Sequence, residues 1–336
     1  MAATCFAVLE GLLVTGGSLE GCEPDRPAVL SPPPPPGGGE CGGGPDGSPD
    51  EERPQASYLS LAVHGTILRM QVICTLGDLL LDVVVKLSRP LAEGDDTNGE
   101  TRAGAGGQAA NVAAWSAALG AEARFIGKRG ADAAGELVEA DLLRHTVDVL
   151  GPPPVGRNGV VVSLVDLDGA RTMVSDRGVA PQLAPDELER EWFGNADWLH
   201  LSGYSLMGEP IGSAAERAVA LARDAGARIS VDLSSVNLIR EFGARELADR
   251  FGRLRPDVVF GNEAEHEELP VPSEVQIVKR GPRGATIGGQ DLAPVAGDVV
   301  DTTGAGDALA AGYLVGGPEL AMEAAARCVG QLGTMP

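Results

Sequence analysis

The sequence contains no run of about eighteen apolar residues, so it predicts no membrane-spanning helix. Its first segment, MAATCFAVLEGLLVTGG, is mildly apolar but lacks the basic start of a signal peptide. Cysteine is scarce: the chain has five cysteines and no CxxC pair. This usage favours a reduced cytoplasmic protein and disfavours a metal site built on cysteines.

Basic residues are also few. The 336-residue chain has 26 lysines and arginines against 48 aspartates and glutamates, a net charge of −22. An acidic surface of this kind excludes nonspecific binding to nucleic acid or to acidic membranes, and an anionic substrate would need a local basic pocket. With 43% hydrophobic residues, the chain is long and apolar enough for a sizeable core.

Residues 1–69 differ in composition from the rest. The stretch SPPPPPGGGECGGGPDGSPDEERP (31–54) has five consecutive prolines and too few apolar residues to bury a core. It predicts disorder with a short polyproline II piece, and a proline-rich ligand for a partner domain is the functional alternative. We expect Met70 to be the natural start, with residues 1–69 a dispensable tail or a gene-model extension.

From residue 70 onward, apolar strand-like runs alternate with helical segments. This order predicts a three-layer α/β/α domain over 70–336, with a mostly parallel central sheet covered on both faces. Two hairpin-like regions, near 80–105 and 159–176, interrupt this alternation of strands and helices and predict a small β-sheet lid over a pocket. The expected helices are 108–119, 132–144, about 212–225, 243–252, 306–316 and 319–330.

The stretch DTTGAGDALAAGY (301–313) reads as a small-residue loop that leads into a helix. Small residues let the N–H groups of Gly304, Ala305 and Gly306 point at one spot, and the helix N-terminus adds partial positive charge. These groups form an anion hole beside Asp307, although an acid there could equally be a helix cap. No Walker A loop is present. GAGGQA (104–109) fits the dinucleotide pattern, but the polar residues before it argue against a Rossmann fold.

Several motifs together resemble the ribokinase-like (PfkB) carbohydrate kinases, and the resemblance covers essentially all of 70–336. DTTGAGD and the earlier GGQAANVAAWSAALG are similar to the two signatures of that family. Four further stretches fall in the family's order: IGKRGADAAGE (126–136), DLDGARTMVSDRG (166–178), GNEAE (261–265) and VKRGPRGA (278–285).

The resemblance implies transfer of the γ-phosphoryl group of ATP to a hydroxyl of a sugar or nucleoside. It implies that Asp307 is the catalytic base, and the residue chemistry agrees, because a hydroxyl is a poor nucleophile until a carboxylate accepts its proton. The N–H groups of Gly304, Ala305 and Gly306 would hold the charge that builds on the transferred group.

On the nucleotide side, Asn262 and Glu265 match the family's NxxE motif, which organises Mg²⁺, water and phosphates. Taken alone, the same pair outlines a helix capping box. The resemblance also places Lys279, Gly281 and Gly284 near ATP. It matches Asp301 and Thr303 to positions that bind a monovalent cation in some relatives, so K⁺ is a candidate additional cofactor.

On the sugar side, the resemblance matches Asp82 to the sugar-binding aspartate, with Asp78 as a second candidate. Gly107 would allow close backbone approach, and Asn111 would donate to and accept from hydroxyls, unless it is an ordinary helix residue. Four further polar residues are interpreted locally: Asp132 as a helix cap, His200 as a core residue, and Arg171 and Arg177 as lid charges or ligands of an acidic substrate.

We therefore expect a cytoplasmic, ATP- and Mg²⁺-dependent kinase of a hydroxymethyl group on a small sugar or sugar acid. A homodimer through the lid strands is a further expectation from the resemblance. A nucleoside kinase is the first alternative, disfavoured because only 4% of residues are aromatic. A non-catalytic sugar-binding or regulatory protein is the second, disfavoured by the intact GAGD. The sequence does not name the sugar.

Overall fold

The computed structural model describes residues 62–63, 66–67, 69–168 and 171–336. The expectations for the proline-rich tail lie outside these residues and stay predictions. Within the described ranges, no helix is both long and apolar enough to cross a membrane.

The centre of the fold is a nine-stranded sheet in the order β15-β14-β13-β12-β11-β10-β3-β6-β7. Seven of its strands run parallel, and the β14–β15 hairpin is added antiparallel at one edge. Its strands are β3 (Val72–Leu76), β6 (Glu122–Ile126), β7 (Val147–Leu150), β10 (Trp198–Ser202), β11 (Arg228–Asp232), β12 (Val258–Asn262), β13 (Val275–Lys279), β14 (Ala285–Ile287) and β15 (Gln290–Leu292).

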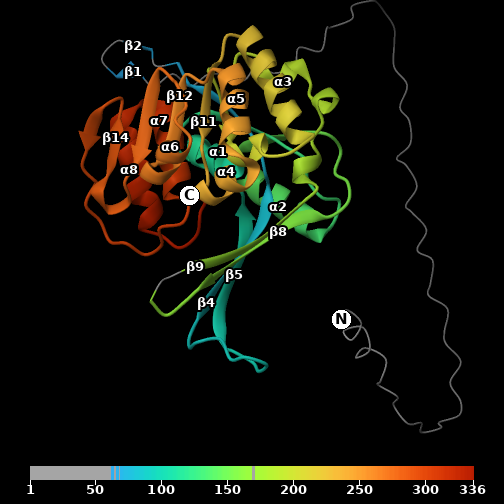
Figure 1. Cartoon of the computed structure of the whole chain (residues 1–336), viewed down its shortest axis with the longest axis vertical. Coiled ribbons are helices and arrows are strands. Elements are labelled where there is room, and N and C mark those ends of the chain that lie inside the picture. The colour runs from blue at the N-terminus through green and yellow to red at the C-terminus, as the bar shows by residue number, and fades with distance from the viewer. Residues whose placement is uncertain (1–61, 64–65, 68, 169–170) are drawn as a thin grey trace, which may run out of the picture. The chain divides into compact units, whose positions relative to one another are not determined.

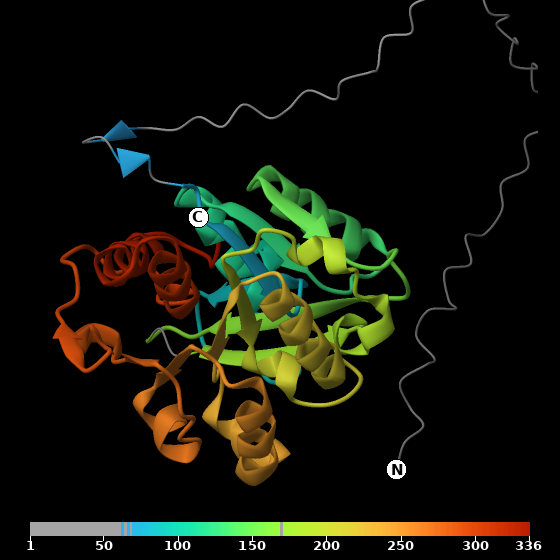
Figure 2. The same cartoon turned by 90° about the horizontal axis from the view of Figure 1, so that it is seen from above.

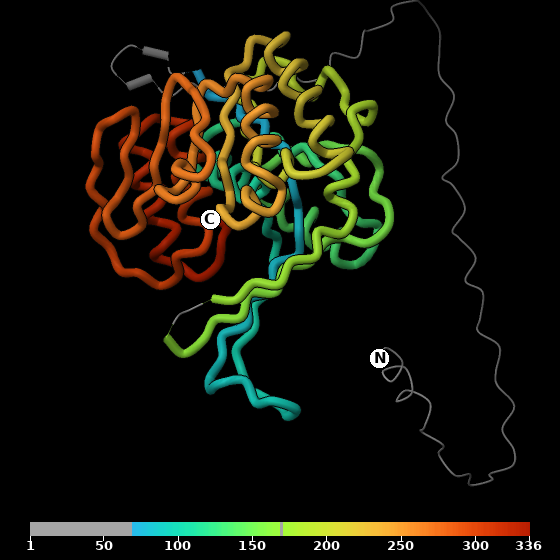
Figure 3. The backbone as a smooth tube through the Cα atoms, in the orientation of Figure 1, coloured from blue at the N-terminus to red at the C-terminus, as the bar shows by residue number. Residues whose placement is uncertain are grey.

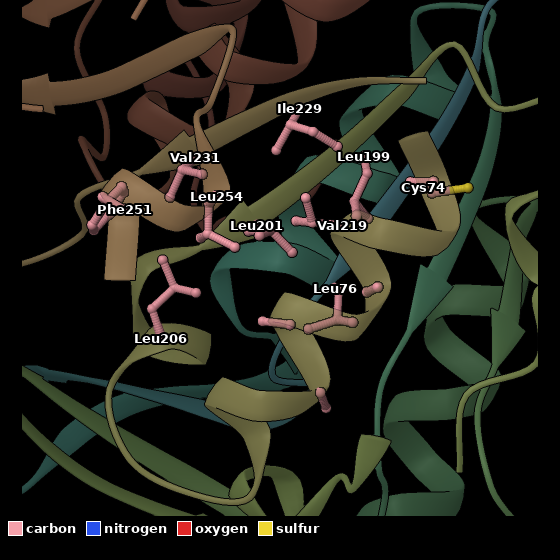
Figure 4. Close-up of a cluster of buried hydrophobic side chains, with 14 of the residues drawn as sticks. Cys74, Leu76, Leu199, Leu201, Leu206, Val219, Ile229, Val231, Phe251 and Leu254 are labelled. Carbon is pink, nitrogen blue, oxygen red and sulfur yellow. The ribbon is translucent and has the colours of Figure 1, made fainter. Parts of the chain in front are cut away.

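Helices cover both faces of this sheet (Figure 2). They are α1 (Gln108–Ala118), α2 (Ala133–Arg144), α3 (Ile211–Asp224), α4 (Val236–Phe242), α5 (Ala244–Leu254), α6 (Glu263–Glu268), α7 (Ala305–Gly316) and α8 (Pro318–Val329). Successive strand residues face opposite layers. In β12, Val259 belongs to the core under α3 and α5, whereas Val258 and Phe260 belong to the core under α1, α7 and α8. Figure 4 shows the first of these two cores.

Four strands form a second, smaller sheet in the order β5-β4-β8-β9. They are β4 (Leu80–Leu87), β5 (Gly99–Gly106), β8 (Asn158–Val165) and β9 (Arg171–Gly178). Figure 1 shows them projecting from the layered part. Figure 3 shows that the segments β4–β5 and β8–β9, which are far apart in the sequence, lie side by side. Strand β9 is mostly solvent-exposed. The two predicted lid regions are thus strands of one sheet.

The six expected helices all form, with ends within two residues of the expected ones. Two further helices, α4 and α6, were not predicted from the sequence and are only seven and six residues long. Too few turns are present in such segments for a helical period to emerge. GAGGQA joins an antiparallel lid strand to α1, so the rejection of a Rossmann reading is confirmed.

A separate two-stranded pair, β1 (Ala62–Val63) with β2 (Thr66–Ile67), precedes the large sheet in the chain.

Candidate active site

A cavity of about 220 Å³ lies where the carboxyl ends of the parallel strands meet the lid. In open α/β sheets this edge is the usual place for a ligand. Asp307, Asn111, Asp82 and Gly107 all line it, so the structure brings together four residues that the sequence analysis placed on the acceptor side.

Asp307 lies in the first turn of α7, which begins at Ala305 after Gly304. Gly304 has a φ of +79°, and a Cβ there would lie 2.9 Å from the backbone of Thr334. A glycine is therefore required to bring the loop into this turn. The first turn leaves backbone N–H groups without an intrahelical acceptor, as the predicted anion hole demands.

The Asp307 carboxylate is held by α1: Asn111 Nδ2 donates to Asp307 Oδ2 at 2.7 Å. Burial raises the pKa of Asp307 to about 7, although the Asn111 amide and the Lys279 ammonium lower it, and Asp232 raises it further. A carboxylate with a pKa near neutrality is well matched to accepting a proton from a hydroxyl.

Two acceptor atoms in this cavity have no protein partner. Asp82 Oδ1 and Asn111 Oδ1 are both buried and make no hydrogen bond within the described chain. Burial also raises the pKa of Asp82, as does the nearby Asp301, while Arg171 lowers it. Buried acceptors of this kind are costly unless a donor reaches them, and a hydroxyl group of a ligand would be such a donor.

Arg177 and Asp78 form an ion pair at the cavity wall. Arg177 Nε and one terminal nitrogen donate to the two carboxylate oxygens at 2.6 and 2.8 Å, and the guanidinium also donates to the carbonyl of Tyr204. Asp78, the second sugar-binding candidate, is therefore already engaged. Gly107, with a φ of +101°, lies so close to Asp78 that a Cβ would be 2.3 Å from its carbonyl oxygen.

Several polar residues in the cavity were not identified from the sequence, among them Gln108, Ser202 and Ser234. Gln108 Oε1 accepts from both serine hydroxyls, at 2.7 and 2.6 Å. A signal was available for Gln108, which directly follows Gly107 in the quoted GGQAAN motif. The serines could not be found in the same way, because only the order of strands in the sheet brings them to Gln108.

A second cavity, of about 390 Å³, lies on the other side of the DTTGAGD loop. Lys279, Gly281 and Gly284 line it, together with apolar residues of α7 and α8, as the resemblance implied for a nucleotide site. Thr303 and Gly304 face the first cavity, whereas Ala305 and Gly306 face the second. The loop thus separates the two cavities.

Lys279 forms an ion pair with a buried carboxylate. Its Nζ donates to the oxygens of Asp232 at 2.7 and 3.0 Å, and the Asp232 side chain is only 1% exposed. Burial alone would lower the pKa of Lys279, but Asp232 and Glu265 raise it overall. A Cβ on Gly306 would lie 3.3 Å from the Nζ atom, so this cation stands beside the first turn of α7.

Asn262 and Glu265 form the capping box of α6. Asn262 Oδ1 accepts from Glu265 N at 2.9 Å, and Glu265 Oε2 accepts from Asn262 N at 2.8 Å. Neither residue lines the two cavities. Burial raises the pKa of Glu265, and Lys279 lowers it. The local interpretation as a cap is confirmed, and the role in organising Mg²⁺ stays a prediction.

Asp301 has donors on both carboxylate oxygens. Asp301 Oδ1 accepts from the Arg171 guanidinium, from Thr303 N at 2.8 Å and from the Thr303 hydroxyl at 2.7 Å. Asp301 Oδ2 accepts from Gly333 N at 3.1 Å. Burial would raise the pKa of Asp301, but these bonds and the guanidinium lower it overall. Arg171 balances the charge of this carboxylate, and binding of a monovalent cation by Asp301 and Thr303 stays a prediction.

Two local interpretations are confirmed. Asp132 Oδ1 accepts from Gly135 N at the start of α2, as expected of a helix cap. His200 is fully buried, pairs with Ser230 Oγ at 3.0 Å, and has a pKa lowered to about 4 by burial.

In the part of the chain that the structure describes, no group of three or more histidine, cysteine, aspartate or glutamate side chains could hold a metal ion.

A family model described as pfkB family carbohydrate kinase matches residues 70–329. The ATP-dependent ribose-1-phosphate kinase of Halopiger xanaduensis is 32% identical over 282 residues, which cover 75% of this chain and 88% of the relative. The solved adenosine kinase of Sinorhizobium meliloti has a TM-score of 0.70 at 22% identity, covering 80% of this chain and 96% of that one. An E. coli protein described as a ribokinase II, solved with ATP and Mg²⁺, has a TM-score of 0.64 at 22% identity, covering 79% and 95%.

The layered α/β fold, the lid and the loop between two cavities define an ATP-dependent phosphotransferase with an alcohol group as acceptor. The chain belongs to the pfkB family of carbohydrate kinases. The solved structures, at 22% identity, support the fold alone.

Proposed function

We propose that this kinase transfers the γ-phosphoryl group of ATP to a hydroxymethyl group of a small neutral sugar. The observation that carries the proposal is the pair of buried, unpartnered acceptors, Asp82 Oδ1 and Asn111 Oδ1, in the same cavity as Asp307. A polyol supplies the hydroxyl donors that these atoms lack. The cavity lining carries three carboxylates, Asp78, Asp82 and Asp307, against one cation, Arg177, which favours a neutral acceptor over a sugar acid or sugar phosphate.

In the proposed reaction, Asp307 accepts the proton of the acceptor hydroxyl while its oxygen forms a bond to the γ-phosphorus. The bond from that phosphorus to ADP breaks in the same in-line step. The N–H groups of Gly304, Ala305 and Gly306 stabilise the charge on the transferred group, and Lys279 adds a cation on the nucleotide side. No phosphoenzyme is needed.

Lys279, Gly281 and Gly284 would contact the ATP phosphates. Asn262 and Glu265 supply oxygen donors of the kind that Mg²⁺ takes in small number, keeping water and phosphate oxygens as its other ligands. When bound, Mg²⁺ neutralises charge on the phosphates. We do not extend the proposal to K⁺, because Arg171 already balances Asp301.

The test is ATP consumption by the full chain with Mg²⁺ and a panel of neutral pentoses and hexoses, sugar acids, nucleosides and ribose 1-phosphate. We expect turnover with a neutral sugar, and its loss in D82N and D307N. Turnover with ribose 1-phosphate but not with ribose would contradict the neutral-acceptor proposal, and turnover with nucleosides alone would favour the nucleoside kinase. Folded protein that binds ATP and consumes none with any acceptor would favour a binding protein.

The lid also supports a proposal for assembly. On β9, Val174 is 62% exposed and Met173 is 55% exposed, although Met173 also borders the cavity. We propose that the lid strands of two chains pair, which would cover Val174 on the face of β9 that points away from the cavity. A monomeric mass in sedimentation at micromolar concentration would contradict the pairing.

A further inference from the structure

The proposed reaction assigns no role to Gln108, yet this residue lines the acceptor cavity. It is the first residue of α1. Its Oε1 accepts from Ser202 Oγ, at the end of β10, and from Ser234 Oγ, just after β11. Three separate elements therefore converge on one amide, and such convergence fixes its orientation.

The hydrogen bonds decide which end of the amide faces Asp307. Ser234 Oγ accepts from Gly203 N at 2.9 Å, and its own hydrogen has two acceptors in reach, Gln108 Oε1 at 2.6 Å and the Asp232 carbonyl at 3.2 Å, of which Gln108 is the nearer. With the oxygen directed at the serines, the amide nitrogen is left for the cavity that Gln108 and Asp307 both line, and the Gln108 side chain lowers the pKa of Asp307. The reverse orientation would set an amide oxygen against a carboxylate, which is electrostatically unfavourable.

Asn111 supports the same arrangement. It lies three residues further along α1, and its Nδ2 donates to Asp307 Oδ2 at 2.7 Å. The first turn of α1 thus presents two amides to one carboxylate. Of the two, only Gln108 is itself oriented by hydroxyl groups from the central sheet.

We propose that Gln108 is a positioning residue, whose amide, oriented by Ser202 and Ser234, holds the Asp307 carboxylate ready to accept the hydroxyl proton. The proposal rests on the proposed role of Asp307 as the base. It also assigns the two serines a function, because their hydroxyl groups fix the amide in place beside the carboxylate.

Other charged and titratable groups share the surroundings of Asp307 and set the background for a pH test. Burial is the main cause of its pKa of about 7. Because the Gln108 amide donates to the anionic form, its removal should raise that pKa further. The neighbouring groups, which the test leaves unchanged, are Asp78, Asp82, Arg177, Tyr204, Asp232, Glu265, Lys279 and Cys328.

The experiment follows kcat/KM of the full chain between pH 6 and 9, with the acceptor that the panel identifies. Wild-type activity should fall on the acid side as Asp307 becomes protonated. In Q108L, we expect this acid limb to move up by about one pH unit, and in Q108E by more, because a like charge then faces Asp307. The loss in Q108L should therefore be about tenfold near pH 6, about fivefold at pH 7 and small at pH 9, with KM for ATP unchanged.

Two controls sharpen the test. Gln290 is exposed in β15, so Q290L should leave the profile in place. The double variant S202A/S234A keeps Gln108 and should move the limb in the same direction as Q108L, which tests the proposal even where Q108L does not fold. If both altered chains fold and lose activity equally at all pH values, Gln108 does not act through Asp307.

Failure of the proposed base is distinguishable from failure of this inference. Turnover in D307N equal to wild type would refute the base itself. If no acceptor in the panel reacts, the difference in unfolding free energy between wild type and D307N, followed over pH, reports the same pKa. An unchanged midpoint of that difference in the Q108L background would overturn the role of Gln108.

Discussion

Replacing Asp307 with asparagine tests its chemical role and its cost to stability at once. The pKa of Asp307 rises from 3.8 to about 7 on folding, chiefly through burial. Between these values the folded protein retains a proton that the unfolded chain has released. The free energy of unfolding therefore falls as pH rises through this window, and the loss is complete above about pH 7.

The pKa shift gives the size of this change in the free energy of unfolding. Three pKa units correspond to about 4 kcal/mol, but Asp307 faces an open cavity where solvent reduces the cost, so we expect about 2 kcal/mol. Asparagine has nearly the same shape and no charge. D307N should thus be more stable than wild type by about 2 kcal/mol at pH 8, and by less at pH 5. Its turnover should fall by about a thousandfold or more.

Denaturant unfolding at pH 5 and pH 8 measures the stability, and ATP consumption with the identified sugar measures the turnover. D186N is a matched control, because Asp186 is exposed on the surface away from the cavity. A stability difference between D307N and wild type that does not change with pH would refute the assignment of a raised pKa. Wild-type turnover in D307N would refute the assignment of the base.

Three further predictions follow from the site. K279M should lower the free energy of unfolding by about 3 kcal/mol, because it leaves the buried Asp232 carboxylate without its cation. G304A should lower turnover at least about tenfold and stability by about 2 kcal/mol, since a left-handed residue would gain a Cβ against the C-terminal backbone. Replacing K⁺ by Na⁺ should leave turnover nearly unchanged, whereas R171A should lower it by exposing the uncompensated charge of Asp301.

Each of these has a contrary outcome. For the buried ion pair, chemical denaturation of K279M should show the lower free energy of unfolding, and D232N/K279M should recover part of it. Equal stability of wild type, K279M and D232N/K279M would contradict the pairing. For the loop, G297A is the control, because nothing lies within 4 Å of a Cβ there. For the cation, wild-type turnover that rises several-fold with K⁺ over Na⁺ would show that Arg171 does not serve as the counter-ion.

Local patterns in the sequence determined much of the fold. The alternation of apolar strands with helical periods carries its information within each segment, and it predicted the layered domain and six helices to within two residues. The capping box of Asn262 and Glu265 and the cap at Asp132 depend on residues three apart, so spacing alone revealed them. The small-residue loop before Asp307 was equally predictable from the sequence, because a glycine-rich turn into a helix is typical of an anion-binding site.

Only the tertiary structure decided the partners of the charged and polar side chains. Arg177 meets Asp78 across 99 positions, and Lys279 meets Asp232 across 47. Gln108 reaches Ser202 and Ser234 because β10 and β11 are neighbours in the sheet, a fact that no local pattern contains. A charged residue in a sequence can face solvent, substrate or another charge with equal local plausibility. Which of these it faces depends on the order of strands, and that order is set by the packing of the whole domain.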